Sequence, residues 1–189
     1  MAEVKILAEG YAVKIKRGWI ASSTCTLIKD GKTKIVADPG ANKKLLISRL
    51  KKEKLKPSDI NYIFLTHYHL DHILQASLFA KAKILDGSTI YEDDKEFEYS
   101  GEIPGTSISV MKTPGHADEH CSLVVKTEKG KVVVAGDNFW WTRGEKQTLD
   151  VNREDIFANN MEKLKESRKK ILNIADYIIP GHGKMLKVR

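Results

Sequence analysis

The chain has few of the features that mark membrane-spanning or secreted proteins. No apolar run approaches the roughly 18 residues of a membrane-spanning helix, and the longer runs, such as 132–135, suit short strands. Residues 1–10 mix Glu3, Lys5 and Glu9 with apolar residues, which is typical of a strand and unlike the apolar core of a signal peptide. We therefore expect a cytoplasmic protein without a membrane partner.

Cysteine is equally scarce. Only Cys25 and Cys121 occur, and each lies in an apolar stretch with a strand-like pattern. This number and placement argue against the disulfide framework of small secreted proteins, so we expect two reduced thiols in the core.

Linkers and low-complexity segments are also missing. The 189 residues suffice for one compact domain with a sizeable core, and we expect a single domain over residues 1–189. Hydrophobic residues make up 41% and charged residues 30%, a globular balance. Nothing in the sequence indicates an oligomeric state.

The net charge of +7 has two interpretations. A basic surface would attract anionic partners, such as a small anionic substrate or RNA. Many lysines, however, fall in 43–44, 51–56 and 163–170, which are patterned as amphipathic helices, so they would form solvated helix faces. We favour the second interpretation.

Hydrophobic periodicity predicts an α/β chain. Alternation near 2–8, 11–16 and 20–29 suggests antiparallel strands, while Asp38-Pro39-Gly40 separates the strand near 32–37 from a helix that ends at about residue 54. This order of elements suggests two mixed β-sheets packed face to face with helices outside. The remaining strands are expected near 60–65, 82–85, 88–91, 107–112, 121–126, 131–135 and 177–179, with helices over 71–80 and 153–174.

Residues 66–72 read Thr-His-Tyr-His-Leu-Asp-His and lie between a predicted buried strand and a predicted helix. Imidazole and carboxylate groups are good ligands for zinc and similar ions. A sharp strand-to-helix turn can direct side chains two residues apart toward one point and the next two toward another. His67, His69, Asp71 and His72 could therefore serve two neighbouring ions.

Further metal-capable residues follow other strands. His116 comes after Thr113-Pro114-Gly115, Asp137 after an apolar run and Gly136, and His182 after Pro180-Gly181. Such residues at several strand ends are what a site at one edge of a sheet needs. The alternative is that they are ordinary turn residues, but five of only six histidines belong to the pattern, so we favour a metal site.

In this order, His-x-His-x-Asp-His at 67–72, Pro-Gly-His at 114–116, Gly-Asp at 136–137 and Gly-His at 181–182 resemble the metallo-β-lactamase superfamily. The resemblance implies an αββα sandwich and two bound divalent metal ions. We expect zinc, with iron or manganese as alternatives. By resemblance, one ion is held by His67, His69 and His116, the other by Asp71, His72 and His182, and Asp137 bridges them.

Several residues differ from the patterns of known subfamilies, and these differences exclude or disfavour those subfamilies. Zinc β-lactamases usually have cysteine at the position of Asp137, and di-iron oxidoreductases usually have glutamate at that of His69, so both activities are disfavoured. Gln75-Ala76 replaces the Gly-Gly common in glyoxalase II-like enzymes, and the chain is too short for nucleases with a large inserted domain. Residues 116–125 and 136–140 resemble the group around metallo-β-lactamase domain-containing protein 1, which has been linked to RNA cleavage.

Two ions could share a water and present it as hydroxide to the substrate, with Asp71 and Asp137 orienting it as catalytic residues. The one remaining histidine, His120, is either the general acid or a structural residue, and we favour the structural role. Trp140, Trp141 and Arg143 directly follow Asp137 and are candidates for an aromatic wall and an anion-binding group, or for a packed loop.

Three functions remain open. The first is hydrolysis of a small, anionic ester, thioester or lactone, which we favour. The second is an RNA phosphodiesterase, which the basic charge and the subgroup resemblance suggest. The third is a non-catalytic metal-binding or di-iron redox module, which a ligand set with open positions disfavours.

Overall fold

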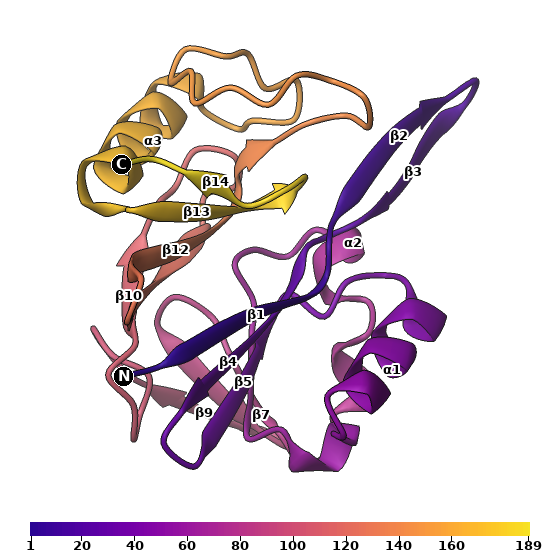
Figure 1. Cartoon of the computed structure of the whole chain (residues 1–189), viewed down its shortest axis with the longest axis vertical. Coiled ribbons are helices and arrows are strands. Elements are labelled where there is room, and N and C mark those ends of the chain that lie inside the picture. Colours follow the sequence, from indigo (N-terminus) through magenta and orange to yellow (C-terminus); the bar gives the residue numbers. More distant parts are fainter.

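Two β-sheets packed face to face form the centre of the molecule in a computed structural model that describes residues 1–189 (Figure 1). The first sheet has seven strands and the second has five. In spatial order the first contains β1 (Glu3–Ala8), β4 (Cys25–Asp30), β5 (Thr33–Ala37), β6 (Tyr62–Phe64), β7 (Lys83–Leu85), β8 (Thr89–Glu92) and β9 (Lys95–Glu98). The second contains β10 (Ser109–Lys112), β11 (Cys121–Thr127), β12 (Gly130–Trp140), β13 (Tyr177–His182) and β14 (Leu186–Lys187).

Both sheets are mixed, as predicted. In the first, β5, β6 and β7 are parallel and the other pairs are antiparallel. In the second, β12 and β13 are parallel. Parallel strands end at the same edge of a sheet, so the residues that follow β6, and those at the ends of β12 and β13, can meet.

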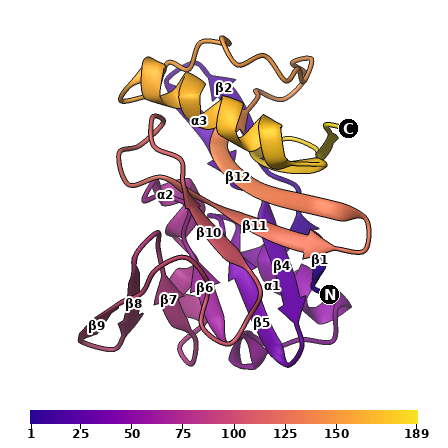
Figure 2. The same ribbon diagram turned by 90° about the vertical axis from the view of Figure 1, so that its left-hand side faces the viewer.

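Helices cover the outer faces of the two sheets. Helix α1 (Lys43–Lys52) lies against the first sheet, and α3 (Met161–Ile174) runs along the second beside β12 (Figures 1 and 2). The side chains of Asn42 and Asn160 cap their first turns by accepting bonds from the Leu45 and Lys163 amides at 3.1 and 3.0 Å. The predicted αββα sandwich is thereby confirmed. No helix is both long and apolar enough to span a bilayer.

Alternation along the strands sorts the apolar residues into three layers, because neighbouring side chains of a strand point to opposite faces. Ile28 and Ile35 face the second sheet, whereas Leu27 and Val36 face α1. Ile171 of α3 packs on the outer face of the second sheet. Residues that fill the space between the sheets include Phe64, Leu85, Leu123, Val125, Val134 and Ile179.

A two-stranded ribbon, β2 (Tyr11–Ile15) and β3 (Gly18–Ser22), projects from the sandwich beside α2 (Figure 1). Its strands are antiparallel, with Lys14 opposite Trp19. The prediction of antiparallel pairing is right for this ribbon, but β1 pairs with β4 rather than with β2. The predicted strand 20–29 is divided into β3 and β4.

Two helix predictions were too long. The expected helix 71–80 consists of α2 (Leu70–Ile73) and a short 3-10 helix (Ala76–Leu78), and another 3-10 turn covers Pro57–Asp59. The expected helix 153–174 begins only at Met161. Ile156 and Phe157, which fall within the predicted helix, are 71% and 44% exposed in the preceding loop. The first turn begins after the cap at Asn160.

The strand predictions were otherwise confirmed with shifted ends. Strand β12 extends to Trp140 rather than ending near 135, and β13 extends to His182. The segment between the predicted strands 88–91 and 107–112 contains β9, which pairs with β8 as a hairpin. The two-residue β14 was not predicted because it is too short to show a pattern.

Candidate metal centre

Strand ends and one short helix bring the predicted ligands to one edge of the sandwich. His67 and His69 follow β6, and Asp71 and His72 lie on α2. His116 lies in the turn between β10 and β11. Asp137 and His182 lie near the ends of β12 and β13.

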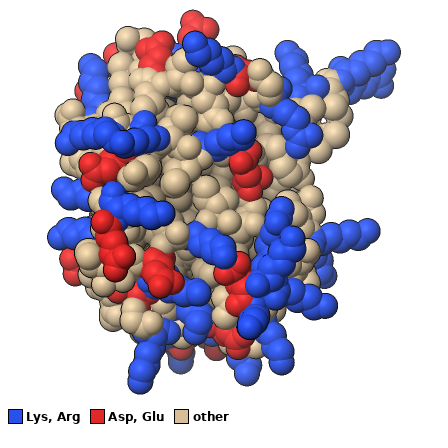
Figure 3. Space-filling view, viewed as in Figure 1, with Lys and Arg blue, Asp and Glu red and all other residues tan.

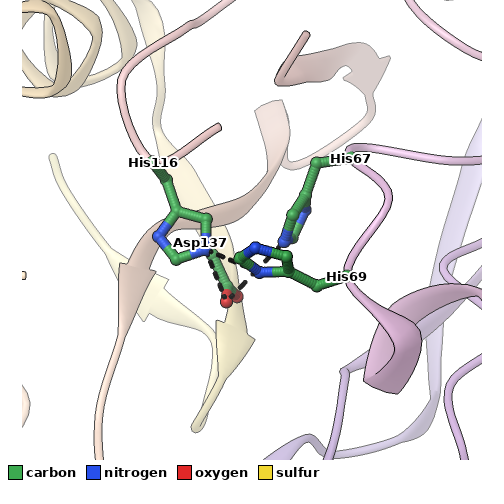
Figure 4. Close-up of side chains that lie close together, drawn as sticks. All are labelled: His67, His69, His116 and Asp137. Carbon is green, nitrogen blue, oxygen red and sulfur yellow. Dashed lines mark hydrogen bonds and ion pairs between the residues drawn. The ribbon is translucent and has the colours of Figure 1, made fainter. Parts of the chain in front are cut away.

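All seven predicted ligands meet, and they form two groups. The first consists of His67, His69, His116 and Asp137, whose ligand atoms lie within 4.8 Å of one another (Figure 4). The second consists of Asp71, His72 and His182, within the same limit.

Asp137 lies between the groups and gives one oxygen to each. Its Oδ1 lies 3.2 Å from His72 Nε2 and 3.6 Å from His182 Nε2. Its Oδ2 lies 3.4 Å from His116 Nε2 and 4.0 Å from His67 Nε2. This is the placement that a bridging carboxylate requires.

Close packing of two strands brings Asp137 to this position. A Cβ atom on Gly181 would lie 1.7 Å from Asp137 Oδ1, so only glycine allows β13 to pass this carboxylate. Asp71 Oδ2 lies 3.1 Å from His182 Nε2, the same ring atom that Asp137 Oδ1 approaches. The Pro-Gly-His and Gly-His motifs therefore supply close backbone approach as well as ligands.

Hydrogen bonds fix the direction of four imidazoles. The Nδ1 atoms of His72 and His116 lie 2.8 and 2.7 Å from the carboxylates of Asp38 and Asp155. His182 Nδ1 lies 3.2 Å from a backbone carbonyl, and His67 Nδ1 lies 3.0 Å from a threonine hydroxyl. In each ring this leaves Nε2 directed at the centre, as is usual for metal-bound histidines. His69 instead presents Nδ1, 3.0 Å from His116 Nε2.

The chemistry of the centre fits bound cations. The Nε2 atoms of His67 and His72, and Oδ1 of Asp137, are buried and have no hydrogen-bond partner. His72 and Asp137 are close enough to interact, but their atoms do not meet at a hydrogen-bonding angle. Buried polar atoms without partners are costly, and divalent cations held at the two groups would satisfy all three.

The two groups differ in protonation. Burial and the neighbouring histidines lower the pKa of His67 and His69, so these rings are neutral near pH 7. Burial acts to lower the pKa of His182, but Asp137 and Asp71 raise it to about 9. Burial likewise opposes the charge on His72, but Asp137 and Asp38 raise its pKa well above the ordinary value.

A cavity of about 500 Å³ opens onto the centre. Five of the ligands contribute to its wall: His69, Asp71, His116, Asp137 and His182. The other lining residues are apolar, namely Ala12, Trp19, Ala21, Ala41, Leu70, Leu74, Trp140 and Phe157, and no lysine or arginine lines it. A larger cavity of about 700 Å³ lies elsewhere, between β1 and β13, and touches none of the ligands.

Of the three residues predicted to bind substrate, one lines this cavity. Trp140 packs edge-on against Trp19 with ring centroids 6.2 Å apart. Trp141 lies in the apolar layer under α3, where its ring stacks on Phe139. Arg143 lies over the ring of Tyr11 and lines a different cavity.

His120 lies behind the ligands and not in the cavity wall. Its ring stacks on that of His67 with centroids 5.0 Å apart, and it is 1% exposed. Its Nδ1 accepts a bond from Asn138 Nδ2 at 2.9 Å. Burial and the nearby His116 lower its pKa to about 3, so it is neutral near pH 7 and has no proton to spare for a leaving group. This placement suits the structural role.

Sequence reasoning missed the residues that hold the ligands. Asp38 also accepts bonds from the amide and hydroxyl of Thr66, so it ties the motif loop to β5. It lies in the predicted break at 38–40, and its φ of 49° agrees with a turn. Asp155 falls within the predicted helix 153–174. Neither lies near its histidine in sequence, so no local spacing could have found them.

Comparison with known proteins agrees with this geometry. A family model described as the metallo-β-lactamase superfamily matches residues 19–110. Metallo-β-lactamase domain-containing protein 1 of Xenopus laevis is 31% identical over 195 residues, covering 98% of this chain and 81% of that protein.

The chain belongs to the metallo-β-lactamase superfamily. Within it, the resemblance to the group around domain-containing protein 1 is confirmed. This superfamily consists of metal-dependent hydrolases, and the chain has a histidine and aspartate cluster that can hold divalent metal.

Solved structures of the superfamily share the fold. A Thermotoga maritima protein provisionally classed as a metallo-β-lactamase aligns with a TM-score of 0.71 and 20% identity, covering 98% of this chain and 99% of that one. AidC, a dizinc quorum-quenching lactonase solved with a product, aligns with a TM-score of 0.64 and 18% identity, covering 87% and 74% of the two chains.

Proposed function

We propose that this protein is a binuclear metal hydrolase that cleaves a small ester, thioester or lactone with an apolar acyl group. One observation carries the proposal: Asp137 gives one oxygen to each of two complete ligand groups in the wall of an open, apolar cavity. Zinc is the ion we expect, and the same ligands would suit iron or manganese.

Two divalent ions bound here would lower the pKa of a water molecule toward neutrality and polarise a substrate carbonyl. His67, His69 and His116 would hold the first ion, and Asp71, His72 and His182 the second. Asp137 would touch both. Asp71 and Asp137 line the cavity, so their carboxylates can orient the attacking water and accept its proton.

The cavity wall favours an apolar acyl group over an anionic one. Trp19, Trp140 and Phe157 form an aromatic cluster on one side, with centroids 5.6 to 6.2 Å apart. Leu70 and Leu74 of α2 also line the cavity. An acyl chain against these residues would leave its carbonyl beside the ligands. AidC, which shares this fold, is a lactonase in complex with an N-acyl homoserine product, and this supports the proposal.

Anion recognition finds less support. No lysine or arginine lines the cavity, and Arg143 lies outside it. On the face seen in Figure 3, lysine and arginine side chains project in many directions, with acidic side chains between them. RNA cleavage therefore stands as the alternative that the charge suggests, without a cationic track into the cavity.

A turnover screen tests the proposal. Protein loaded with two equivalents of zinc would be assayed on thioesters, aryl esters and N-acyl lactones of increasing chain length, and on short RNAs. We expect acyl substrates to be cleaved, faster with longer chains, and a chelator to abolish turnover. Efficient RNA cleavage without turnover of any ester, thioester or lactone would overturn the proposal.

A matched pair of variants tests the apolar wall. Leu74→Asp places a charge in the lining, while Ile15→Asp changes a similarly exposed residue that does not line the cavity. We expect Leu74→Asp alone to lose the preference for long acyl chains. Equal effects of the two variants would show that the wall does not select the substrate.

A further inference from the structure

Helix α3 contains a buried arginine whose guanidinium has no carboxylate partner. Arg168 is 1% exposed and makes no ion pair. A buried cation is costly unless hydrogen bonds compensate it. Burial lowers the pKa of Arg168 to about 10, so it remains protonated near neutral pH. A buried charge of this kind is a poor way to fill the core, so its hydrogen bonds need to be accounted for.

The hydrogen bonds of Arg168 go to two separate stretches of backbone. Its Nε donates to the carbonyl of Asn138 at 2.7 Å. Its Nη1 donates to the carbonyls of Val151, at 3.2 Å, and Arg153. Phe139 lies below the guanidinium, 5.8 Å from it. One planar side chain therefore joins β12 to the loop that precedes α3.

Each of these stretches directs one metal ligand. Asn138 follows Asp137 directly in β12. The loop leads to Asp155, whose carboxylate lies 2.7 Å from His116 Nδ1. The same loop donates from the Asn159 amide to the His116 carbonyl at 3.1 Å. Residues 143–160 contain no helix or strand, so contacts such as these determine where the loop lies.

The rest of α3 approaches the same turn. Ser167 donates to the carbonyl of Pro114 at 2.7 Å. A Cβ on Gly115 would lie 2.2 Å from the Leu164 amide nitrogen, so glycine is needed for this approach. Arg168 thus belongs to a helix that also touches the His116 turn through Ser167 and Leu164.

We infer that Arg168 is a positioning residue that fixes Asp137 and His116 relative to each other and so shapes the first ligand group. The inference rests on the proposed function, since it assumes that this group holds a metal. A lysine would keep the charge but lose the planar fork that reaches three carbonyls. We therefore expect Arg168→Lys to disturb the centre even when the chain folds.

The affinity for Co²⁺ can be measured at each group separately in variants that keep only one complete group. In a His182→Ala background only the first group is complete, and in a His67→Ala background only the second. We expect Arg168→Lys to weaken Co²⁺ binding to the first group by about 10- to 100-fold, the usual effect of a residue that orients ligands, and to alter its visible spectrum. The second group, which depends on Arg168 only through Asp137, should change by a smaller factor.

Ile171→Ala serves as the control, since Ile171 is a buried residue of the same helix that packs in the apolar layer under α3. It should lower the melting temperature without changing Co²⁺ affinity. If Arg168→Lys does not fold, Arg168→Gln, which keeps amide donors, takes its place.

A double-mutant cycle with Asp155→Asn separates positioning from general stability. If Arg168 acts partly through Asp155, the two losses in Co²⁺ affinity should be less than additive. Unchanged affinity in Arg168→Lys, or the same loss in Ile171→Ala, would overturn the inference. A parent chain that binds no Co²⁺ at either group would instead refute the proposed function.

Discussion

The two ligand groups share Asp137 but are held in different ways. In the first, His67 and His69 are neutral, and a single carboxylate, Asp155, stands behind His116. In the second, His72 lies between two carboxylates, Asp38 and Asp137. Two imidazoles of the first group are free to bind metal, whereas the second group carries protons that a metal must displace. The charges around a group of ligands, and not only the kind of ligand, therefore determine whether its imidazoles are protonated.

The residue common to both groups should give the largest effect. Asp137→Asn removes the negative charge that faces both groups, so we expect turnover to fall by more than about a hundredfold, the upper range for residues that only orient ligands. Bound metal should fall as well, while the circular dichroism spectrum stays unchanged. A variant that keeps near wild-type activity would refute the bridging role.

Variants of the two supporting carboxylates should separate the groups. Asp155→Asn should weaken metal binding at the first group, and Asp38→Asn at the second, each by about 10- to 100-fold. Competition with a chromogenic chelator would measure both, in the His182→Ala and His67→Ala backgrounds respectively. Equal losses at both groups from either variant would mean that the groups are not held independently.

Acidity should affect the groups unequally. The pKa of His182 is about 9 and that of His72 is also raised, so both rings are protonated at pH 7 in the metal-free chain. Metal binding at the second group must release these protons, so its affinity should rise between pH 6 and 9. Burial and neighbouring histidines lower the pKa values of His67 and His69, so protons compete less with metal at the first group.

Binding titrations at several pH values, in the same two backgrounds, would measure this difference. The first group should show the weaker pH dependence. Parallel pH profiles for the two groups would contradict the assigned protonation states.

The smallest effect is expected from His120→Ala. His120 lies behind His67 and does not line the cavity, so hydrolysis of an activated thioester should slow by less than about tenfold. Thiolates leave readily without protonation, which makes thioesters the most tolerant substrates. A loss above about a hundredfold, the usual contribution of a general acid, together with RNA cleavage, would make His120 the acid and the phosphodiesterase reading correct.

The clustering of the seven candidate ligands was predictable because the local sequence places them. His67 to His72 lie within one turn, and His116, Asp137 and His182 each follow a glycine after an apolar strand. The sandwich followed from the same alternation of apolar residues. These features depend on neighbouring residues, which is the information that a single sequence contains.

The supporting residues were not predictable for the opposite reason. Asp38 is 34 residues from His72, and Asp155 is 39 residues from His116. The loop before α3 has apolar residues at helical spacing, yet it folds irregularly around the His116 turn. Trp140 and Trp141 are adjacent at the end of a strand, and only the first faces the cavity. The positions of all these residues depend on tertiary contacts, which the local sequence does not specify.

Metal content tests the central claim most directly. Protein purified without chelator and reconstituted with zinc would be analysed for bound metal, alongside His182→Ala. The account predicts two equivalents of divalent metal per chain, and about one in the variant, whose first group is intact. Well under one equivalent in the reconstituted wild-type chain would contradict it.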